Sequence, residues 1–298
     1  MRSRVGFALL FSACVPKLPQ LGDPCAEYPE PGLYQHDIDT PEGASRKVFV
    51  YVPSGVGPRD LVVALHGSAE SATDFSAVTQ FISASEQEGG GYVSIFPQGR
   101  GFLFNSWNAG DCCGSSDEAN NDVDDVDFLD QAVREISPLV CGDRVFATGF
   151  SNGAMMAHRW ACESTRVDAA MPASGPLLRA SCKGAPLPVR HIHGLADTRV
   201  PFEGGPGDGP GGNVYPSAES TMDLWKERNL CTADAPTVLV TGSTTCTSWV
   251  CAASTTLCTI EGWDHRWPGG IHSEALEINA TTDGVAWFQS TATQAEVE

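Results

Sequence analysis

A serine flanked by glycines carries the strongest chemical signal in the sequence. Gly149-Phe150-Ser151-Asn152-Gly153 is a G-x-S-x-G motif between a run typical of a buried strand and a run typical of a helix. At such a junction the chain turns sharply, and the glycines remove side chains that would clash. A serine hydroxyl presented there, at a helix N-terminus, is suited to attack a carbonyl carbon. The motif therefore predicts Ser151 as a catalytic nucleophile.

A nucleophilic serine needs a base, and the base needs an acid that orients it. After an elbow of this kind the expected order is serine, then acid, then histidine, each just after a later strand. Asp197 follows the strand-like run Val189–His193, and His265 follows Leu257–Ile260. These positions predict Asp197 as the acid and His265 as the base. The competing residues, less well placed, are Asp208, Asp223 and His272.

The tetrahedral intermediate of acyl transfer carries a negative oxygen that backbone N–H groups can hold. One donor is expected directly after the nucleophile, at Asn152, and the second in the loop after an early strand. That loop reads His66-Gly67-Ser68. We predict the N–H groups of Ser68 and Asn152 as the oxyanion hole, with Gly67 as the alternative to Ser68.

The elements that would position these residues alternate between strands and helices. Strands are predicted at Lys47–Val52, Leu61–Leu65, Tyr92–Phe96, Arg144–Thr148, Val189–His193 and Leu257–Ile260. Helices are predicted at Ser71–Glu86, Asp125–Ile136, Asn152–Cys162, Ala218–Arg228 and Asp283–Gln289. This alternation predicts an α/β fold with a mainly parallel central sheet and helices on both faces. No linker or repeat divides the chain, so we expect one catalytic domain at residues 22–298.

The charge balance excludes one class of partner. The chain has 37 acidic and 18 basic residues, a formal net charge of -19, and no basic block that could bind phosphates. We therefore expect no nucleic acid partner. No run beyond the N-terminus is apolar for long enough to span a bilayer.

Residues 1–21 have the features of an export segment. Arg2 and Arg4 precede a short apolar run that ends in small residues. The run Leu10–Cys14 also resembles a bacterial lipobox, in which the cysteine is lipidated. Two alternatives stay open: a cleaved signal peptide, or a tether held at the membrane by a lipid on Cys14. Both predict a secreted or extracytoplasmic protein.

The cysteine count agrees with export. Setting Cys14 aside leaves an even number of the 11 cysteines, which predicts disulfides in an exported chain. The cysteines lack the paired spacing of a zinc site, so no metal is expected.

Several motifs occur together along the chain. They are Leu65-His66-Gly67, Trp107-Asn108-Ala109-Gly110, Cys112-Cys113-Gly114, Asp124-Asp125-Val126, the run Ala147–Met156, Ala161-Cys162-Glu163 and His265-Arg266-Trp267-Pro268-Gly269. The set resembles the polyhydroxybutyrate depolymerase-like esterase family, which includes secreted feruloyl and acetylxylan esterases of carbohydrate esterase family one. The resemblance extends from Pro31 to the C-terminus. It implies an α/β-hydrolase fold, no metal or organic cofactor, and a triad of Ser151, Asp197 and His265.

The chain departs from this family beside the predicted base. The family has Gly-Gly-Gly-His-Thr-Trp-Pro-Gly where this chain has Gly262-Trp263-Asp264-His265-Arg266-Trp267-Pro268-Gly269. The departures put substrate preference in doubt more than chemistry. We predict that three tryptophans line the substrate site, with a core position as the alternative: Trp107, Trp263 and Trp267. We also consider a disulfide between Cys162 and either Cys112 or Cys113.

Together these observations predict a secreted serine carboxylic ester hydrolase acting on feruloyl or acetyl esters linked to plant polysaccharide. One alternative is a polyester depolymerase that acts on hydroxyalkanoate chains. A serine peptidase would need an added element for peptide recognition, which the sequence does not supply. A non-catalytic, lipid-anchored binding protein would require a misassembled triad.

Overall fold

The computed structural model describes residues 15–20, 22, 25, 28–40, 45–55, 57–87, 91–101, 105–110, 123–209, 212–275 and 277–295. The predicted lipidation site Cys14 and the cysteines Cys112 and Cys113 lie outside these residues, as does most of the predicted export segment.

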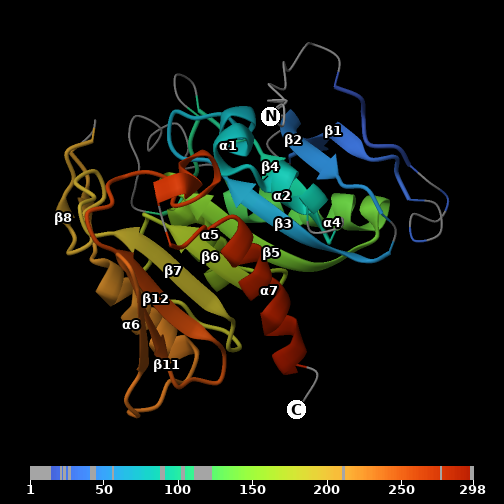
Figure 1. Cartoon of the computed structure of the whole chain (residues 1–298). Coiled ribbons are helices and arrows are strands. Elements are labelled where there is room, and N and C mark those ends of the chain that lie inside the picture. Colours follow the sequence, from blue (N-terminus) through green and yellow to red (C-terminus); the bar gives the residue numbers. More distant parts are fainter. Residues whose placement is uncertain are drawn as a thin grey trace, which may run out of the picture.

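A ten-stranded sheet runs through the protein in the order β1–β2–β4–β3–β5–β6–β7–β12–β11–β10 (Figure 1). The strands are β1 (Gly32–Asp39), β2 (Ser45–Val52), β3 (Arg59–Leu65), β4 (Tyr92–Pro97), β5 (Gly142–Phe150), β6 (Ala169–Ala173), β7 (Val189–Gly194), β10 (Thr237–Thr241), β11 (Thr244–Trp249) and β12 (Thr255–Ile260). From β4 to β12 neighbouring strands are parallel, and both edges are antiparallel. The short strands β8 (Gly205–Pro206) and β9 (Val214–Tyr215) form a separate pair. The predicted mainly parallel sheet is confirmed.

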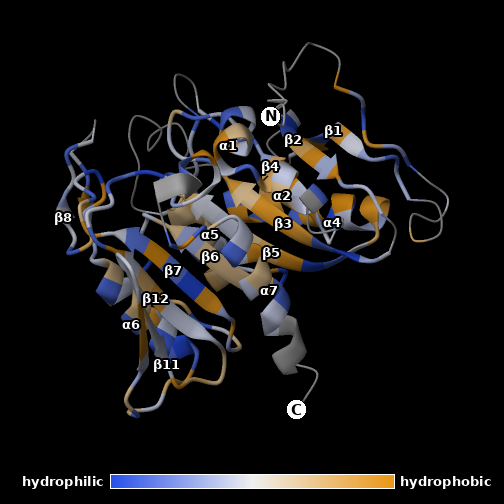
Figure 2. Cartoon of the chain, in the orientation of Figure 1, coloured by the Kyte–Doolittle hydropathy of each residue, from blue (hydrophilic) through white to orange (hydrophobic). Residues whose placement is uncertain are grey.

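Helices cover both faces of the sheet, also as predicted. On one face lie α4 (Asp125–Val140), α5 (Asn152–Glu163) and α6 (Ala218–Arg228), which share a core cluster containing Trp160 and Trp225. The other face is covered by α1 (Ala72–Thr79), α2 (Phe81–Gln87) and α7 (Thr282–Ala295), whose cluster contains Phe75 and Phe288. The central strands β3 and β5 are strongly apolar in Figure 2 because a parallel strand covered by helices is buried on both faces.

Some elements differ from the predictions for local reasons. The predicted helix Ser71–Glu86 is two helices, because Gln80 adopts a left-handed φ of 58° and its N–H donates to Ser76 O. Strand β6 was not predicted, since its sequence Ala-Ala-Met-Pro-Ala lacks the β-branched residues typical of a strand. The Thr-rich β10 and β11 were also missed, because their apolar residues do not form a buried run.

The described residues include four disulfides: Cys25–Cys141, Cys162–Cys182, Cys231–Cys251 and Cys246–Cys258. The considered pairing of Cys162 with Cys112 or Cys113 is therefore wrong. Cys162 lies in the last turn of α5, and the loop after β6 brings Cys182 to it.

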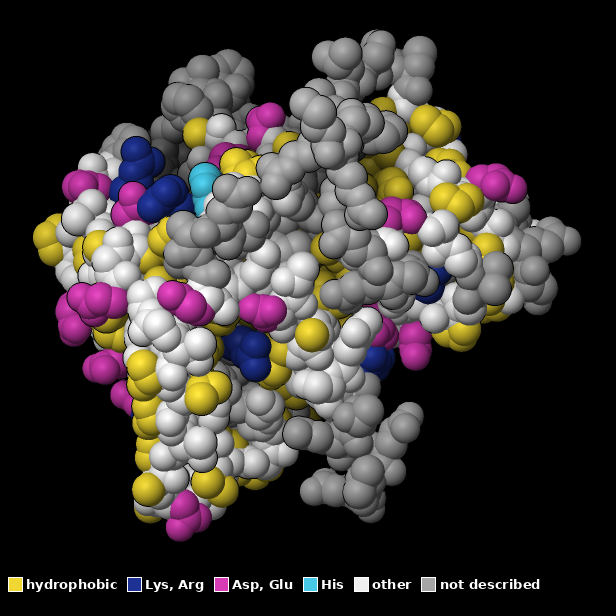
Figure 3. All heavy atoms as spheres, viewed as in Figure 1, with side chains coloured by type: hydrophobic (Ala, Val, Ile, Leu, Met, Phe, Trp, Pro, Cys, Tyr) yellow, Lys and Arg dark blue, Asp and Glu magenta, His cyan; other side chains and the backbone are white. Residues whose placement is uncertain are grey.

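The surface reflects the acidic composition. Acidic side chains are spread over the face shown in Figure 3 and outnumber basic ones. Exposed apolar side chains gather on and beside the β10–β11 hairpin, at Val238, Leu239, Val240 and Val250. Among the described helices, none has the length and apolar character needed to cross a membrane.

Candidate active site

Ser151 lies at a sharp turn between β5 and α5. Its φ of 56° and ψ of -122° place it in a strained backbone region. The turn brings backbone atoms so close that a Cβ on Gly149 would lie 2.4 Å from Gly153 O, and one on Gly153 would lie 2.1 Å from Leu65 O. The glycines of the motif are therefore required by the close approach of the chain to itself. Ser151 N donates to Ala173 O at 3.0 Å, which ties the turn to β6.

The structure brings the three predicted triad residues together. His265, in the loop after β12, accepts a hydrogen bond from Ser151 Oγ at its Nε2, with 2.9 Å between the atoms. Its Nδ1 donates to Asp197 Oδ2 at 2.7 Å. The Asp197 side chain is fully buried and that of His265 nearly so. The imidazole also packs against the ring of Phe150, with centroids 4.7 Å apart.

Backbone N–H groups hold the other oxygen of the Asp197 carboxylate. Arg199 N and Val200 N donate to Oδ1 at 3.0 and 2.9 Å. The turn after β7 thus leaves Oδ2 free to accept from His265.

The loop after β3 carries the predicted second oxyanion donor. Gly67 N donates to the carboxylate of Glu70 at 2.9 Å, and Ala69 N donates to Asn105 O at 2.8 Å. Gly67 N is therefore occupied, and Ser68, which is exposed, stays the better candidate. Within the described part of the chain, no protein acceptor is recorded for the N–H of Ser68 or of Asn152.

Asn152 also has a side-chain role that the sequence did not predict. Its Oδ1 accepts from Trp107 N at 2.7 Å, and its Nδ2 donates to Trp107 O at 3.0 Å. This two-way bond fixes the start of α5 against the segment at residues 105–110.

His66 and Glu70 shape the same loop, and neither was predicted to have a catalytic role. His66 Nδ1 donates to Gly67 O at 2.7 Å, and its Nε2 accepts from Gly99 N at 2.9 Å. Burial lowers the pKa of His66 to about 4, so the ring is neutral. Burial raises the pKa of Glu70, whereas its bond to Gly67 and the nearby His265 act in the opposite direction. In the sequence, the only indication of this role for Glu70 is that its carboxyl group lies three residues after Gly67.

Comparison with known proteins finds relatives that are named as esterases. A segment of 203 residues is 30% identical to feruloyl esterase B of Piromyces equi and covers 63% of this chain and 36% of that protein. Another of 172 residues is 30% identical to the bifunctional acetylxylan esterase/xylanase XynS20E of Neocallimastix patriciarum, covering 56% of this chain and 24% of that protein. An acetyl xylan esterase from Aspergillus awamori superposes with a TM-score of 0.62 at 17% identity, covering 82% of this chain and 97% of that one.

The chain has the α/β-hydrolase fold, and the relatives that match part of it are named as esterases. The predicted fold and the resemblance to feruloyl and acetylxylan esterases are confirmed. No protein-family model matches the chain. The chain spans well under half the length of the first two curated relatives.

The three tryptophans predicted at the substrate site are buried. Trp107 is 0% exposed and donates from its indole to His66 O, and Trp267 is 1% exposed and donates to Thr281 Oγ1. These two residues therefore occupy the core position that was the alternative to lining the substrate site, with their indole N–H groups bonded inside the protein. Trp263 is also buried, and the guanidinium of Arg266 lies over its ring at 4.2 Å.

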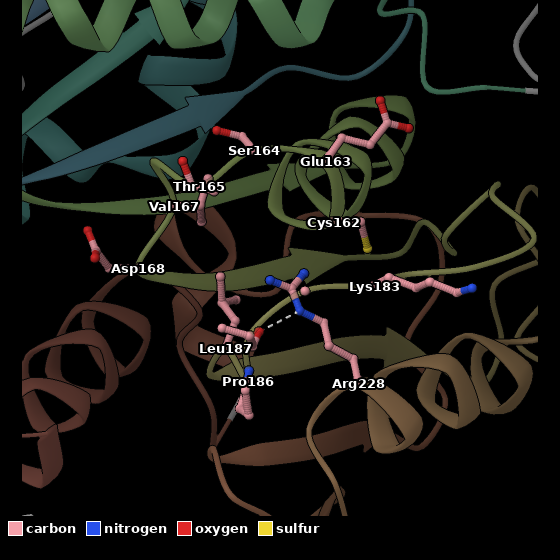
Figure 4. Close-up of a pocket in the computed structure, with 12 residues that line it drawn as sticks. Cys162, Glu163, Ser164, Thr165, Val167, Asp168, Lys183, Pro186, Leu187 and Arg228 are labelled. Carbon is pink, nitrogen blue, oxygen red and sulfur yellow. Dashed lines mark hydrogen bonds between the residues drawn. The ribbon is translucent and has the colours of Figure 1, made fainter.

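A cavity of about 290 Å³ lies at the other end of α5, away from the triad (Figure 4). Its lining includes Arg228 and Cys162, and Cys162 forms a disulfide with Cys182. Arg228 Nη1 donates to Ala161 O at 2.5 Å, and its Nε donates to Ala185 O at 2.9 Å, so this side chain satisfies carbonyls near the end of the helix. The cavity contains none of the predicted site residues.

The described residues contain no group of three or more His, Cys, Asp or Glu side chains that could hold a metal ion.

Proposed function

We propose that this α/β-hydrolase is a serine carboxylic ester hydrolase with Ser151 as nucleophile, His265 as base and Asp197 as the orienting acid. One observation carries the proposal: an unbroken line of hydrogen bonds runs from Ser151 Oγ through both ring nitrogens of His265 to Asp197 Oδ2. This is the arrangement that a nucleophile, base and orienting group need. The names of the esterase relatives support the same reaction class.

The proposed mechanism follows from the atoms in this line. His265 Nε2 takes the proton of Ser151 Oγ as the oxygen attacks the ester carbonyl. The N–H groups of Ser68 and Asn152 stabilise the oxyanion, and Asp197 stabilises the imidazolium. His265 then passes its proton to the leaving alcohol, which breaks the ester bond. Water repeats the sequence on the acyl-enzyme, releases the acid and restores Ser151.

The substrate class within this proposal is a feruloyl or acetyl ester carried by plant polysaccharide. The support is that two relatives are named feruloyl esterase B and bifunctional acetylxylan esterase/xylanase. The four disulfides support an oxidising, extracellular setting for the protein. We include secretion by the N-terminal segment in the proposal, with a lipid on Cys14 as its membrane-anchored variant.

A fluorophosphonate probe tests the nucleophile. We expect the oxidised protein to be labelled at Ser151, and Ser151→Ala to lose both the label and about 10⁶-fold in kcat. Absence of labelling on the folded, oxidised wild-type protein would exclude the proposal that it is a serine hydrolase.

A substrate panel tests the ester class. We expect hydrolysis of methyl ferulate or of acetylated xylan in addition to 4-nitrophenyl acetate, with Ser151→Ala as the control on each. Cleavage of the activated acetate without either natural ester would remove the polysaccharide assignment. A hydroxybutyrate oligomer as the best substrate would replace it with the polyester alternative.

A further inference from the structure

Three buried histidines lie behind the triad and take no part in the proposed mechanism. His158 lies on α5, the helix that begins after Ser151, and His191 and His193 lie on β7, the strand that leads to Asp197. Their exposed fractions are 0%, 0% and 1%. Buried imidazoles are costly unless their ring nitrogens have partners, so this cluster needs an explanation.

The rings form a continuous chain of hydrogen bonds between two core groups. Trp225 Nε1 lies 2.9 Å from His158 Nδ1, and His158 Nε2 lies 3.0 Å from His191 Nδ1. His191 Nε2 lies 3.0 Å from His193 Nδ1, and His193 Nε2 lies 2.8 Å from Val200 O. The chain therefore crosses from α6 through α5 and β7 to the turn that holds the triad acid.

The two ends of this chain fix the direction of every bond. An indole N–H can only donate, and a backbone carbonyl can only accept. Each ring between them must therefore accept at Nδ1 and donate at Nε2, which is possible only for a neutral imidazole. The geometry assigns the Nε2–H tautomer to all three of His158, His191 and His193.

The electrostatics of the site agree with neutral rings. Burial lowers the pKa of His158 to about 3, and burial with the neighbouring rings lowers the pKa of His191 well below its ordinary value. Burial also lowers the pKa of His193, against the attraction of Asp197.

The last hydrogen bond of the histidine series, from His193 to Val200, involves a residue that also bonds to the Asp197 carboxylate. Val200 O accepts from His193, and Val200 N donates to Asp197 Oδ1 at 2.9 Å. The Val200 residue is thus held on both sides, by the histidine chain and by the carboxylate. His193 Nε2 also lies 3.6 Å from Asp197 Oδ2, the oxygen that accepts from His265.

We propose that His193 is a positioning residue for the triad acid: backed by His191 and His158, it holds Val200 so that the Asp197 carboxylate stays in line with His265. This inference rests on the proposed function, because it assumes that Asp197 serves as the triad acid. The three histidines connect α5, which begins after Ser151, with the turn that contains Asp197 through hydrogen bonds in the core.

Two substitutions at one position separate hydrogen bonding from packing. In His193→Gln the amide nitrogen can still donate to Val200 O, whereas His193→Leu fills the space without a donor. Val189→Ala is the control, because Val189 is a fully buried residue of the same strand with no polar side-chain group. It destabilises the core but leaves the acid turn intact.

The kinetic test uses 4-nitrophenyl acetate at neutral pH. A displacement of the acid should lower kcat of His193→Leu by about 10- to 100-fold with little change in KM. We expect His193→Gln to recover most of that loss, and Val189→Ala to keep the wild-type kcat per folded molecule. The inference is overturned if His193→Leu behaves like Val189→Ala, or if His193→Gln is as impaired as His193→Leu.

A spectroscopic test does not depend on activity. In ¹⁵N-histidine-labelled protein, the proton between His265 Nδ1 and Asp197 should give a strongly downfield resonance in the wild type and in His193→Gln, and lose it in His193→Leu. Long-range proton–nitrogen spectra should show the three core rings protonated at Nε2. An unchanged downfield resonance in His193→Leu, or an Nδ1–H tautomer at any of the three rings, overturns the inference. If the wild type takes up no fluorophosphonate, the proposed function fails, and this spectrum still decides whether His193 positions Asp197.

Discussion

Glu70 accepts a hydrogen bond from the N–H of Gly67 at 2.9 Å, in the loop that precedes the predicted oxyanion donor Ser68. This bond fixes the orientation of the peptide group that contains the Gly67 N–H. It thereby also restricts the direction of the next N–H, that of Ser68. We expect Glu70→Ala to lower kcat by about 10-fold, a part of the loss that follows removal of an oxyanion donor. Glu70→Gln keeps an oxygen that can accept from Gly67 and should retain most of the activity. Steady-state kinetics on 4-nitrophenyl acetate measure both variants.

The comparison of these variants also distinguishes hydrogen bonding from charge. If Glu70→Gln were as slow as Glu70→Ala, the negative charge near His265 would be the important property. Wild-type rates for both variants would show that the loop keeps its conformation without Glu70.

The buried histidines should make the fold sensitive to acid. The pKa of His158 is about 3 in the folded protein because of burial, against an ordinary value of 6.5. Between these values the unfolded chain binds a proton that the folded protein does not, so the free energy of unfolding falls as pH falls below 6.5. One such group contributes a slope of about 1.4 kcal/mol per pH unit. We expect His158→Gln to reduce the slope by about that amount between pH 4 and pH 6.

Urea unfolding at several pH values measures this slope. Val189→Ala, which removes no titrating group, should lower the free energy of unfolding by a similar amount at each pH. Identical slopes for His158→Gln and the wild type would contradict the prediction, because they would mean that His158 is protonated in the folded protein.

The three residues of the proposed triad, which the structure joins by hydrogen bonds, could be singled out in the sequence because each follows a recognisable strand. Ser151 lies in a motif with a characteristic backbone geometry, and Asp197 and His265 lie in the loops that follow β7 and β12. The carboxyl ends of parallel strands lie at one edge of a sheet. The position of each residue just after a strand was therefore sufficient to predict that the three lie close together. The alternation of strands and helices predicted the mainly parallel sheet for the same reason.

The contacts that cross between elements could not be predicted in this way. The hydrogen bond of His158 with His191 depends on how α5 lies against β7, and no spacing in the sequence encodes it. Trp107 and Trp267 were placed at the substrate site because they flank site motifs, whereas side-chain rotamers turn both into the core. Glu70 has a local partner, but a carboxyl three residues after a glycine is too common a pattern to identify it.

The turn at Ser151 predicts a strict requirement for glycine. A Cβ on Gly153 would lie 2.1 Å from Leu65 O and 2.5 Å from His66 O, and both neighbours are backbone atoms that a rotamer change cannot move. We expect Gly153→Ala to destabilise the protein by about 3 kcal/mol or to move Ser151 out of line with His265. Gly209→Ala is the matched control, because its Cβ would meet nothing within 4 Å. Thermal unfolding and fluorophosphonate labelling measure the two effects, and a stable, labelled Gly153→Ala would contradict the geometry.

The disulfides should differ in their contribution to stability according to the length of chain that each closes. Cys25–Cys141 joins residues 116 positions apart, and Cys246–Cys258 joins residues 12 positions apart. The loss of chain entropy in the unfolded state grows with the logarithm of this separation, which makes the longer loop more stabilising by about 2 kcal/mol. Replacing both cysteines of each pair by alanine tests the difference, with the free energy of unfolding obtained from guanidinium titrations without reductant. An equal loss in the two double variants would mean that the region around Cys25 stays near Cys141 in the unfolded chain, or that local packing rather than chain entropy determines the contribution of each bond.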